Sequence, residues 1–491
     1  MKQVSTLGEL KAAGYQSKSI KDELRENLIR KLSSGEAVFP EIKGFEDTVI
    51  PDLERAILSR HNMLLLGLRG QAKTRIARLM VHLMDDYIPI IKGNELNDDP
   101  LNPITFEGKQ MVEEHGDDCP IDWLPKEERF VEKLATPDVS IADLIGDVDP
   151  IKAASMKLAY SDERVIHFGL VPRAHRSIFV INELPDLQAR IQVALFNILQ
   201  EGDIQIRGFK LRMPLDLQFI FTANPEDYTN RGSIITPLKD RIESQILTHY
   251  PKTLDIAKEI TQQEAHISAA QRDAVHIPEL LKDFIELITF KARESEYVDE
   301  NSGVSARLSI SAMENLYSAA ERRMLINKET STTARITDFW GIIPSITGKV
   351  ELVYEGEQSG AYEVAIDIIN EAIQELFLIH FDHPDEGPQG EDSPYVDVKN
   401  YFENRGSVDL INDASGKQYH QELQKVNGLA GLAKTRNFEG EESFTAMELL
   451  LHGLSTFNTI EREIIENTFT FTDPLSDMFG DDDEDLNDLI N

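Results

Sequence analysis

The chain of 491 residues contains a single cysteine, Cys119. One thiol cannot form an intramolecular disulfide, which excludes a disulfide-stabilised scaffold and is typical of a reducing compartment. The sequence also has no run of about 18 apolar residues, so no transmembrane helix is predicted. The first residues lack the hydrophobic segment of a signal peptide. We therefore expect a cytoplasmic protein without a membrane span.

Basic residues are scarce, with 50 Lys and Arg against 86 Asp and Glu and a net charge of −36. Nucleic-acid binding needs clustered Lys and Arg, so nucleic acid is an unlikely partner for the chain as a whole. The motifs G-x-S-x-G, H-E-x-x-H and C-x-x-C are absent. The sequence therefore gives no support to an α/β-hydrolase triad, a zincin or a zinc finger.

One stretch, M-L-L-L-G-L-R-G-Q-A-K-T at residues 63–74, has the pattern of a phosphate-binding loop. A short apolar strand is followed by Gly67 and Gly70, then by Lys73 and Thr74 at the start of a helical pattern. Free N–H groups and the positive end of the helix dipole attract an anion there. In a P-loop the lysine reaches the β- and γ-phosphates, and the hydroxyl binds Mg²⁺.

Ala72 is the departure from the P-loop pattern G-x-x-x-x-G-K-[ST], because it stands where the second glycine belongs. We expect one methyl group to be tolerated if Ala72 keeps a negative φ. An ordinary strand–turn–helix is the alternative interpretation. The predicted nucleotide-binding residues are Gly67, Gly70, Gln71, Ala72, Lys73, Thr74 and Arg75.

Polar residues follow two further apolar runs that we predict to be buried strands. The segment S-I-F-V-I-N-E places Asn182 and Glu183 at the end of one strand, and Asn224 follows the strand predicted at 217–223. Ligands of open α/β sheets bind at the carboxyl ends of the strands. A β-hairpin is predicted between the two, at 203–216, from its alternating pattern.

The predicted fold class is α/β, a parallel P-loop sheet flanked by helices, with an α-helical lid and a mostly helical C-terminal region. Residues 85–128 are unusually polar, and we interpret them as a surface insertion with Cys119 in a loop. The predicted organisation comprises an N-terminal helical arm (1–45), a nucleotide-binding domain (46–250), a helical lid (251–330), a mostly helical region (331–470) and an acidic disordered tail (471–491).

The order of these motifs resembles that of the AAA+ ATPases over residues 36–326. The run D-L-I-G-D-V-D-P, followed by H-F-G-L-V-P-R-A-H-R-S-I-F-V-I-N-E, is similar to the magnesium-chelatase ATPase subunit. The hairpin before T-A-N-P is similar to that of the same branch, which includes the MoxR ATPases. MoxR P-loops can also carry alanine before the lysine. This resemblance implies ATP and Mg²⁺ as cofactors.

The resemblance implies roles for individual residues. Lys73 and Thr74 match the phosphate and Mg²⁺ ligands, and Glu183 matches the Walker B glutamate that polarises water. Asn182 stands where the family usually has Asp, so it offers a hydrogen bond to a metal-bound water but no charge. Asn224 matches sensor 1.

Two arginines match residues that act on the γ-phosphate. Arg241, in P-L-K-D-R, matches the arginine finger of a neighbouring subunit, and Arg307 matches sensor 2 of the lid. Arg241 has the alternative of pairing with Asp240 or Glu243 in its own subunit, and Arg231 is a rival finger. Arg307 has the alternative of an ordinary surface position. Asn182–Glu183 and Asn224 have the alternatives of a solvated strand end and a turn.

A cluster of Arg207, Lys210 and Arg212 lies on the predicted hairpin. In a ring it would form a basic collar for an acidic segment, and a solvated hairpin is the alternative. The resemblance implies a hexameric homo-oligomer that remodels, or inserts metal into, a von Willebrand A-type partner. The rivals are a nucleotide switch with little hydrolysis, a true magnesium chelatase subunit, and an enhancer-dependent transcription activator. The last is the weakest because its G-A-F-T-G-A loop is absent.

Overall fold

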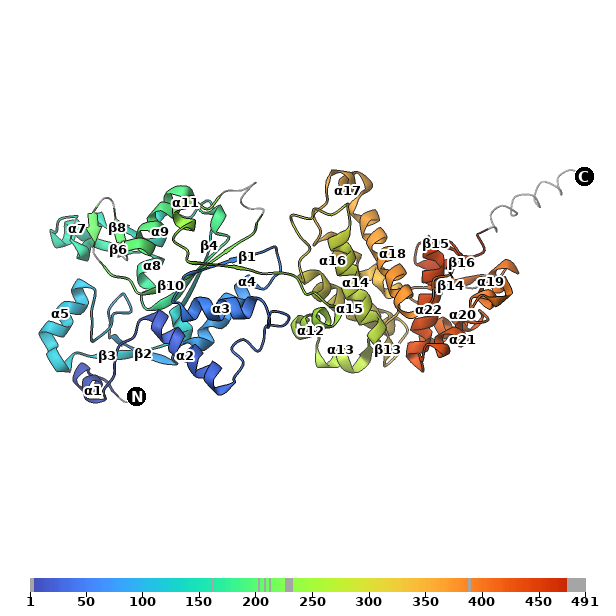
Figure 1. Cartoon of the computed structure of the whole chain (residues 1–491), viewed down its shortest axis with the longest axis horizontal. Coiled ribbons are helices and arrows are strands. Elements are labelled where there is room, and N and C mark those ends of the chain that lie inside the picture. The colour runs from blue at the N-terminus through green and yellow to red at the C-terminus, as the bar shows by residue number, and fades with distance from the viewer. Residues whose placement is uncertain are drawn as a thin grey trace, which may run out of the picture. The chain divides into compact units, whose positions relative to one another are not determined.

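A computed structural model describes residues 4–160, 162–201, 204–206, 209–211, 213–225, 233–386 and 390–474. The chain forms two compact units, Met1–Tyr250 and Pro251–Asn491 (Figure 1). Each unit is described separately. Among the described residues, no helix has both the length and the apolar character needed to cross a membrane.

The first unit is built on a five-stranded sheet. Its strands are β1 (Met63–Leu66), β4 (Phe130–Leu134), β7 (Ser177–Asn182), β10 (Leu217–Ala223) and β11 (Ser244–Leu247). They lie in the order β11-β1-β10-β7-β4, and every pair is parallel. The central strands β7 and β10 are buried throughout, as is typical of a parallel sheet with both faces covered. The sheet therefore confirms the predicted α/β fold class and brings the carboxyl ends of β1, β7 and β10 to one edge.

Helices cover both faces of this sheet (Figure 1). On one face α2 (Ile20–Ser34), α3 (Val49–Leu58) and α4 (Lys73–Leu79) pack against alternate residues of the strands, including Leu65, Val180 and Ile220. On the other face α9 (Ala189–Glu201) packs against the intervening residues, including Phe179 and Phe221. The period of two along each strand thus divides the core into two layers.

The segment 1–45, predicted as a helical arm, contains α1 (Leu7–Ala12) and α2. Ile20, Leu24 and Leu28 of α2 belong to the same core as β1 and α4. Glu23 of α2 also forms a buried ion pair with Arg129, which immediately precedes β4. Apolar packing and a buried charge pair therefore join this segment to the sheet.

The polar stretch 85–128, which the sequence predicts to be a surface insertion with Cys119 in a loop, forms secondary structure of its own. It contains β2 (Tyr87–Ile91), α5 (Phe106–His115) and β3 (Ile121–Pro125), and β2 pairs with β3 antiparallel. Cys119 is fully buried beside Leu7 and Ile91. Most members of this small core come from the stretch itself, and Leu7 of α1 completes it from a distant part of the sequence.

Short antiparallel strand pairs also occur among the described residues of this unit. β5 (Gly146–Val148) pairs with β6 (Ile166–Phe168), and β8 (Ile204–Ile206) pairs with β9 (Phe209–Leu211), which agrees with the hairpin predicted at 203–216. Further α-helices among the described residues of this unit are α6 (Ile141–Leu144), α7 (Pro150–Met156), α8 (Leu170–Arg173) and α11 (Thr236–Lys239). In the part of the chain that the structure describes, short 3-10 helices are η1 (Met80–Leu83), η2 (Gly116–Asp118), η3 (Lys126–Arg129), η4 (Glu163–Val165), η5 (Leu184–Asp186), η6 (Thr337–Ile342) and η7 (Gly390–Asp392).

The second unit is mainly helical and has one hydrophobic core that runs from Ala265 to Phe471. Its helices are α12 (Leu254–Glu264), α13 (Ala269–Ala274), α14 (Glu279–Glu294), α15 (Arg307–Ile326), α16 (Ile343–Thr347), α17 (Tyr354–Ser359), α18 (Ala361–His380), α19 (Val396–Glu403), α20 (Gly416–Gln424), α21 (Leu429–Thr435) and α22 (Glu441–Thr456). Helices α14 and α18 pack closely against each other in the centre of this unit.

Two small sheets occur in this unit. β12 (Val275–His276) pairs with β13 (Thr332–Thr333) in parallel, and β14 (Val408–Ile411), β16 (Thr468–Thr472) and β15 (Glu461–Ile465) form an antiparallel sheet. The end of the chain was predicted as a helix followed by a disordered tail from 471, so β15 and β16 are a correction. Thr468–Thr472 alternates polar and aromatic residues, which suits a strand buried on one face. Residues 475–491 of the predicted tail lie outside the described residues.

Candidate nucleotide-binding site

The P-loop connects the end of β1 to the start of α4. The Gly67 amide donates to the carbonyl of Ala223 at the end of β10, over 3.2 Å. A Cβ atom at Gly67 would lie 2.0 Å from Oγ1 of Thr248 and 2.2 Å from Oε1 of Gln71, so only glycine fits. The Thr248 hydroxyl also donates to Gln71 Oε1 over 2.8 Å. Gln71 thus binds the end of β11 and holds the shape of the loop.

Ala72 occupies the left-handed region with φ 56° and ψ 13°. The expectation of a negative φ at this residue is therefore wrong. Gly70 also has a positive φ, 72°, so the loop turns through two left-handed residues before α4 begins. An alanine in this conformation costs about 1–2 kcal/mol, because its Cβ approaches the following carbonyl oxygen. The pattern glycine has been replaced without a change in the backbone geometry that it serves.

Lys73 is the first residue of α4 and is only 7% exposed. Its ammonium group donates to the carbonyl oxygens of Gly67 and Leu68, the latter over 2.9 Å. It also donates to Oδ1 of Asn224 over 2.6 Å. The residues that match the Walker A lysine and sensor 1 are therefore in direct contact.

A further hydrogen bond extends this contact to the strand-end carboxylate. The amide nitrogen of Asn224 donates to Oε2 of Glu183 over 3.3 Å. Glu183 has a left-handed φ of 55°, and its backbone amide donates to the Thr222 hydroxyl over 3.1 Å. Lys73, Asn224 and Glu183 thus form one hydrogen-bonded chain across the ends of β1, β10 and β7.

Asn182 is held on both sides of its amide. Oδ1 accepts from the Thr222 hydroxyl over 3.1 Å, and Nδ2 donates to Oε1 of Glu132 over 2.6 Å. Glu132 lies on β4, next to β7 in the sheet, and its other oxygen accepts from Nε of Arg78 over 2.9 Å. Asn182 therefore offers a donor to a carboxylate, which an aspartate at this position would repel.

Glu132 and Thr222 were not among the residues predicted for the site. Thr222 was visible in the sequence as part of T-A-N-P, directly before Asn224. Glu132 lies in the segment F-V-E-K-L of β4, and nothing in the sequence indicated that this strand would lie beside β7. The link between Asn182 and Glu132 depends on the strand order.

Thr74 and Arg75 follow Lys73 in the first turn of α4 and are half-buried. Arg75 forms an ion pair of 3.3 Å with Glu41. Arg241 follows α11 and pairs with Asp240, and its guanidinium lies 5.5 Å from the ring centre of Phe196. The intrasubunit alternative for Arg241 thus has a geometric basis, although both partners of the pair are solvent-exposed.

The other predicted basic residues are distributed differently. Arg307 is exposed and begins α15 in the second unit, where its backbone amide donates to the Ser305 hydroxyl over 3.1 Å. Arg231, Arg207 and Arg212 lie outside the described residues, as does the side chain of Lys210. The basic collar and the rival finger therefore stay predictions.

The donor set at this edge suits a nucleoside triphosphate. The loop presents backbone N–H groups and an ammonium group, which bind polyphosphate oxygens. Mg²⁺ is usually held by one or two protein ligands together with phosphate oxygens and water, and Thr74 and Asn182 can supply such oxygens. Within the described ranges, no group of three or more His, Cys, Asp and Glu side chains is placed to hold a metal ion by itself.

Comparison with known families and structures adds an independent finding. Residues 155–246 match the family profile described as the Sigma-54 interaction domain. This match covers about a fifth of the chain, and it includes β7, Asn182, Glu183, β10 and Asn224.

Several solved structures are similar at low identity. A candidate ATPase from Cytophaga hutchinsonii is 17% identical, with 74% of this chain and 97% of that chain covered and a TM-score of 0.30. A complex between the BchI and BchD subunits of magnesium chelatase shows 18% identity, 65% and 97% coverage and a TM-score of 0.33. NtrX from Brucella abortus in complex with ATP shows 14% identity, 59% and 52% coverage and a TM-score of 0.34. This chain thus spans about half the length of the NtrX chain.

These TM-scores are low, and we draw no conclusion about function from the three structures. Three features belong to this chain itself and do not depend on those structures. They are the parallel sheet, the loop between β1 and α4, and the segment 155–246 that matches the family profile. Taken together, they show that the first unit has a parallel α/β fold with a glycine-rich loop between β1 and α4, and that the chain resembles the AAA+ ATPases.

Proposed function

We propose that this chain binds ATP with Mg²⁺ in the P-loop and hydrolyses it. The hydrogen-bonded chain from Lys73 through Asn224 to Glu183 carries this proposal. It joins a phosphate-binding cation, a polar sensor and a carboxylate at one edge of the sheet. Hydrolysis of ATP needs these three groups close together, because catalysis of phosphoryl transfer is mainly positioning and charge stabilisation.

Each residue has a defined task in this proposal. Lys73 donates to phosphate oxygens in place of its present carbonyl acceptors, and the Thr74 hydroxyl contributes to the metal site. Glu183 orients the attacking water and accepts its proton, while Asn224 holds the Glu183 carboxylate and reports on the phosphate. Bound Mg²⁺ would neutralise phosphate charge. Asn182 positions a metal-bound water through Oδ1 without adding a charge.

Arg241 acts from a neighbouring subunit in this proposal. Its pair with Asp240 is exposed on both sides, so its free energy is about 0–1 kcal/mol and a stronger anion can displace it. A γ-phosphate presented by an adjacent copy is such an anion. The proposal therefore includes a homo-oligomeric ring, a hexamer by family resemblance, with Arg307 of the second unit as a further phosphate sensor.

The first experiment is steady-state ATP hydrolysis with Mg²⁺ over a range of protein concentrations. The wild type is compared with Lys73→Ala, Glu183→Gln and Arg241→Ala. Lys126→Ala is the control, because this lysine pairs with Asp86 on the surface of the same unit. We expect activity per chain to rise with concentration, and to fall by at least about 10²-fold in the three site variants.

Two results would contradict the proposal. An active Glu183→Gln enzyme would remove the carboxylate from the mechanism. Tight ATP binding without turnover at any concentration would favour the rival reading, a nucleotide switch, for which the uncharged Asn182 is the main argument. Mixing Lys73→Ala with Arg241→Ala tests the action in trans, because a site formed by the loop of an Arg241→Ala subunit and the finger of a Lys73→Ala subunit has both groups intact.

The output is proposed from family resemblance alone. Magnesium-chelatase and MoxR-type ATPases suggest remodelling of, or metal insertion into, a von Willebrand A-type partner in the cytoplasm. The match to the Sigma-54 interaction domain favours an enhancer-dependent activator as a second candidate. Against it, the G-A-F-T-G-A loop occurs nowhere in the sequence. ATP-dependent binding to a sigma-54 factor would support the second candidate. Binding to a von Willebrand A protein, without binding to a sigma-54 factor, would support the first.

A further inference from the structure

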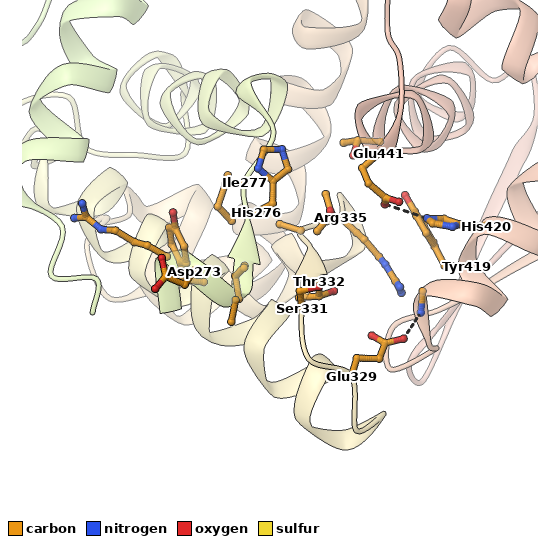
Figure 2. Close-up of a pocket in the computed structure, with 18 of the residues that line it drawn as sticks. Asp273, His276, Ile277, Glu329, Ser331, Thr332, Arg335, Tyr419, His420 and Glu441 are labelled. Carbon is orange, nitrogen blue, oxygen red and sulfur yellow. Dashed lines mark hydrogen bonds and ion pairs between the residues drawn. The ribbon is translucent and has the colours of Figure 1, made fainter. Parts of the chain in front are cut away.

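A cavity of about 610 Å³ lies within the second unit. One wall comprises β12, β13 and the residues that flank them, and the other comprises the beginnings of α20 and α22 (Figure 2). A volume of this size suits a small organic molecule. The cavity is not part of the P-loop site, because all of its lining residues belong to the second unit and the P-loop belongs to the first.

The most unusual group in this cavity is Arg335, which follows β13 and is only 3% exposed. Its guanidinium carbon lies 4.1 Å from the ring centre of Tyr419, and Nη1 donates to the carbonyl of Ala414 over 2.9 Å. No described residue accepts a hydrogen bond from its Nε or Nη2. Figure 2 shows this side chain between Thr332 and Tyr419. A buried guanidinium therefore retains unused donors where it lines a cavity.

The neighbouring carboxylates are engaged elsewhere. Asp338 binds Nε and Nη2 of Arg323 over 3.2 and 2.8 Å. Glu448 accepts from the backbone amides of Ile336 and Thr337 and from the Tyr419 hydroxyl, over 2.7, 2.9 and 2.8 Å. Burial and the Arg323 guanidinium lower the pKa of Arg335. An anion against Arg335 would relieve both effects.

The other lining side chains fit the same chemistry. Ser331 and Thr332 line the cavity with their hydroxyl groups, and so does Lys282, whose ammonium group pairs with Glu279 over 2.9 Å. Of the acidic residues there, Glu441 pairs with His420 over 3.2 Å and Glu329 accepts from the Gly416 amide over 2.8 Å. Both contacts are drawn as dashed lines in Figure 2. Asp273 is exposed, and Figure 2 shows it on the side of the labelled residues opposite Glu441 and His420.

We propose that this cavity binds a small molecule with a carboxylate or phosphate group, which pairs with Nε and Nη2 of Arg335. Arginine presents its donors as a planar fork that matches both oxyanions in a bidentate manner. Thr332 and Ser331 supply further donors beside the fork. The volume leaves room for a body larger than the anion itself, so the ligand is a metabolite-sized molecule and not a bare ion.

Isothermal titration of the full-length chain tests this site with two probes, inorganic pyrophosphate and citrate. The Lys73→Ala substitution is present throughout, so that the P-loop contributes little to phosphate binding. Arg335→Gln is then compared with Arg322→Gln, whose guanidinium is exposed and pairs with Asp413 outside the cavity. We expect Arg335→Gln to weaken binding by at least about tenfold, because it removes a charge-assisted pair, and Arg322→Gln to leave it unchanged.

Ser331→Glu is the second variant, because Ser331 is an exposed residue of the cavity wall and its replacement should not disturb folding. The added carboxylate should also weaken binding at least about tenfold by repulsion. Binding of pyrophosphate alone assigns a phosphate ligand, and binding of citrate alone assigns a carboxylate ligand. The proposal is overturned if neither probe binds at millimolar concentration, or if binding survives both Arg335→Gln and Ser331→Glu. If Arg335→Gln does not fold, the binding of the two probes to Ser331→Glu decides whether the proposal holds.

Discussion

The side-chain amide nitrogen of Asn182 lies 2.6 Å from Oε1 of Glu132, on the neighbouring strand of the sheet. This contact explains why asparagine, and not aspartate, suits the end of β7 in this protein. The negative charge that aspartate would supply is already present on the adjacent strand, where Arg78 partly balances it. The edge of the sheet therefore carries a carboxylate beside Asn182, and β4 contributes it.

This relationship predicts the effect of an aspartate at position 182. Asn182→Asp places a second carboxylate against Glu132, so we expect a loss of about 1–3 kcal/mol in the free energy of unfolding of the first unit. Asn182→Asp combined with Glu132→Gln exchanges the two groups and should recover most of that loss. Urea unfolding of the wild type, both single variants and the double variant measures the coupling. Additive effects would show that the two side chains do not interact.

The left-handed Ala72 predicts that a glycine stabilises the loop. Ala72→Gly relieves the steric cost of φ 56°, and the greater freedom of glycine in the unfolded chain offsets part of this gain. We expect a net increase of up to about 1 kcal/mol, measured by thermal unfolding. Ala194→Gly in α9 is the matched control, and it should lower stability by about 1 kcal/mol because its residue is helical. A loss of stability in both variants would count against strain at Ala72.

The buried pair between Glu23 and Arg129 predicts that replacing one partner destabilises the protein more than replacing both. Arg129 is 1% exposed and donates to both Glu23 oxygens over 2.8 and 2.7 Å. Glu23→Gln leaves that guanidinium uncompensated and should cost about 3–5 kcal/mol. Replacing both residues, as in Glu23→Gln with Arg129→Met, should cost less than the single change. Glu26→Gln removes an exposed partner of Lys18 and serves as the control, with a change below about 1 kcal/mol.

The buried Glu286 predicts a pH dependence of the second unit. Burial raises the pKa of Glu286 from 4.5 to about 7, although the Thr261 hydroxyl donates to its carboxylate over 2.5 Å. Because the pKa is higher in the folded state, the folded state binds the proton more tightly. Its contribution to stability is complete below pH 4.5 and is lost as the pH rises towards 7.

Glu286→Gln keeps the shape and the acceptor oxygen but removes the titration. We expect the variant to be more stable than the wild type at pH 8, by about 1–3 kcal/mol, and the difference to shrink between pH 7 and 4.5. Thermal unfolding at pH 5 and pH 8 measures this, with Glu279→Gln as an exposed glutamate on the same helix for comparison. A constant difference at the two pH values would exclude titration of Glu286 as the cause.

Much of the five-stranded sheet and of its candidate site was predictable because the signals are local. These signals are the four apolar residues before Gly67, the lysine at the helix start and the polar residues after two buried strands. Each signal is contained in a few consecutive positions. The small core around Cys119 and the strands β15 and β16 were not predictable in this way. Leu7 of α1 completes the first of these, and β14 pairs with β16 in the second, and both α1 and β14 are far away in the sequence.

The sequence by itself determined the order of the loop, the strand-end carboxylate and the strand-end asparagine, since these follow from hydrophobic runs and turn residues. Only the tertiary structure decided which side chains meet. The left-handed φ of Ala72, the pairing of Asn182 with Glu132 and the unused donors of Arg335 all depend on strand order and helix packing. Those are set by contacts between distant segments, whose burial outweighs local preference.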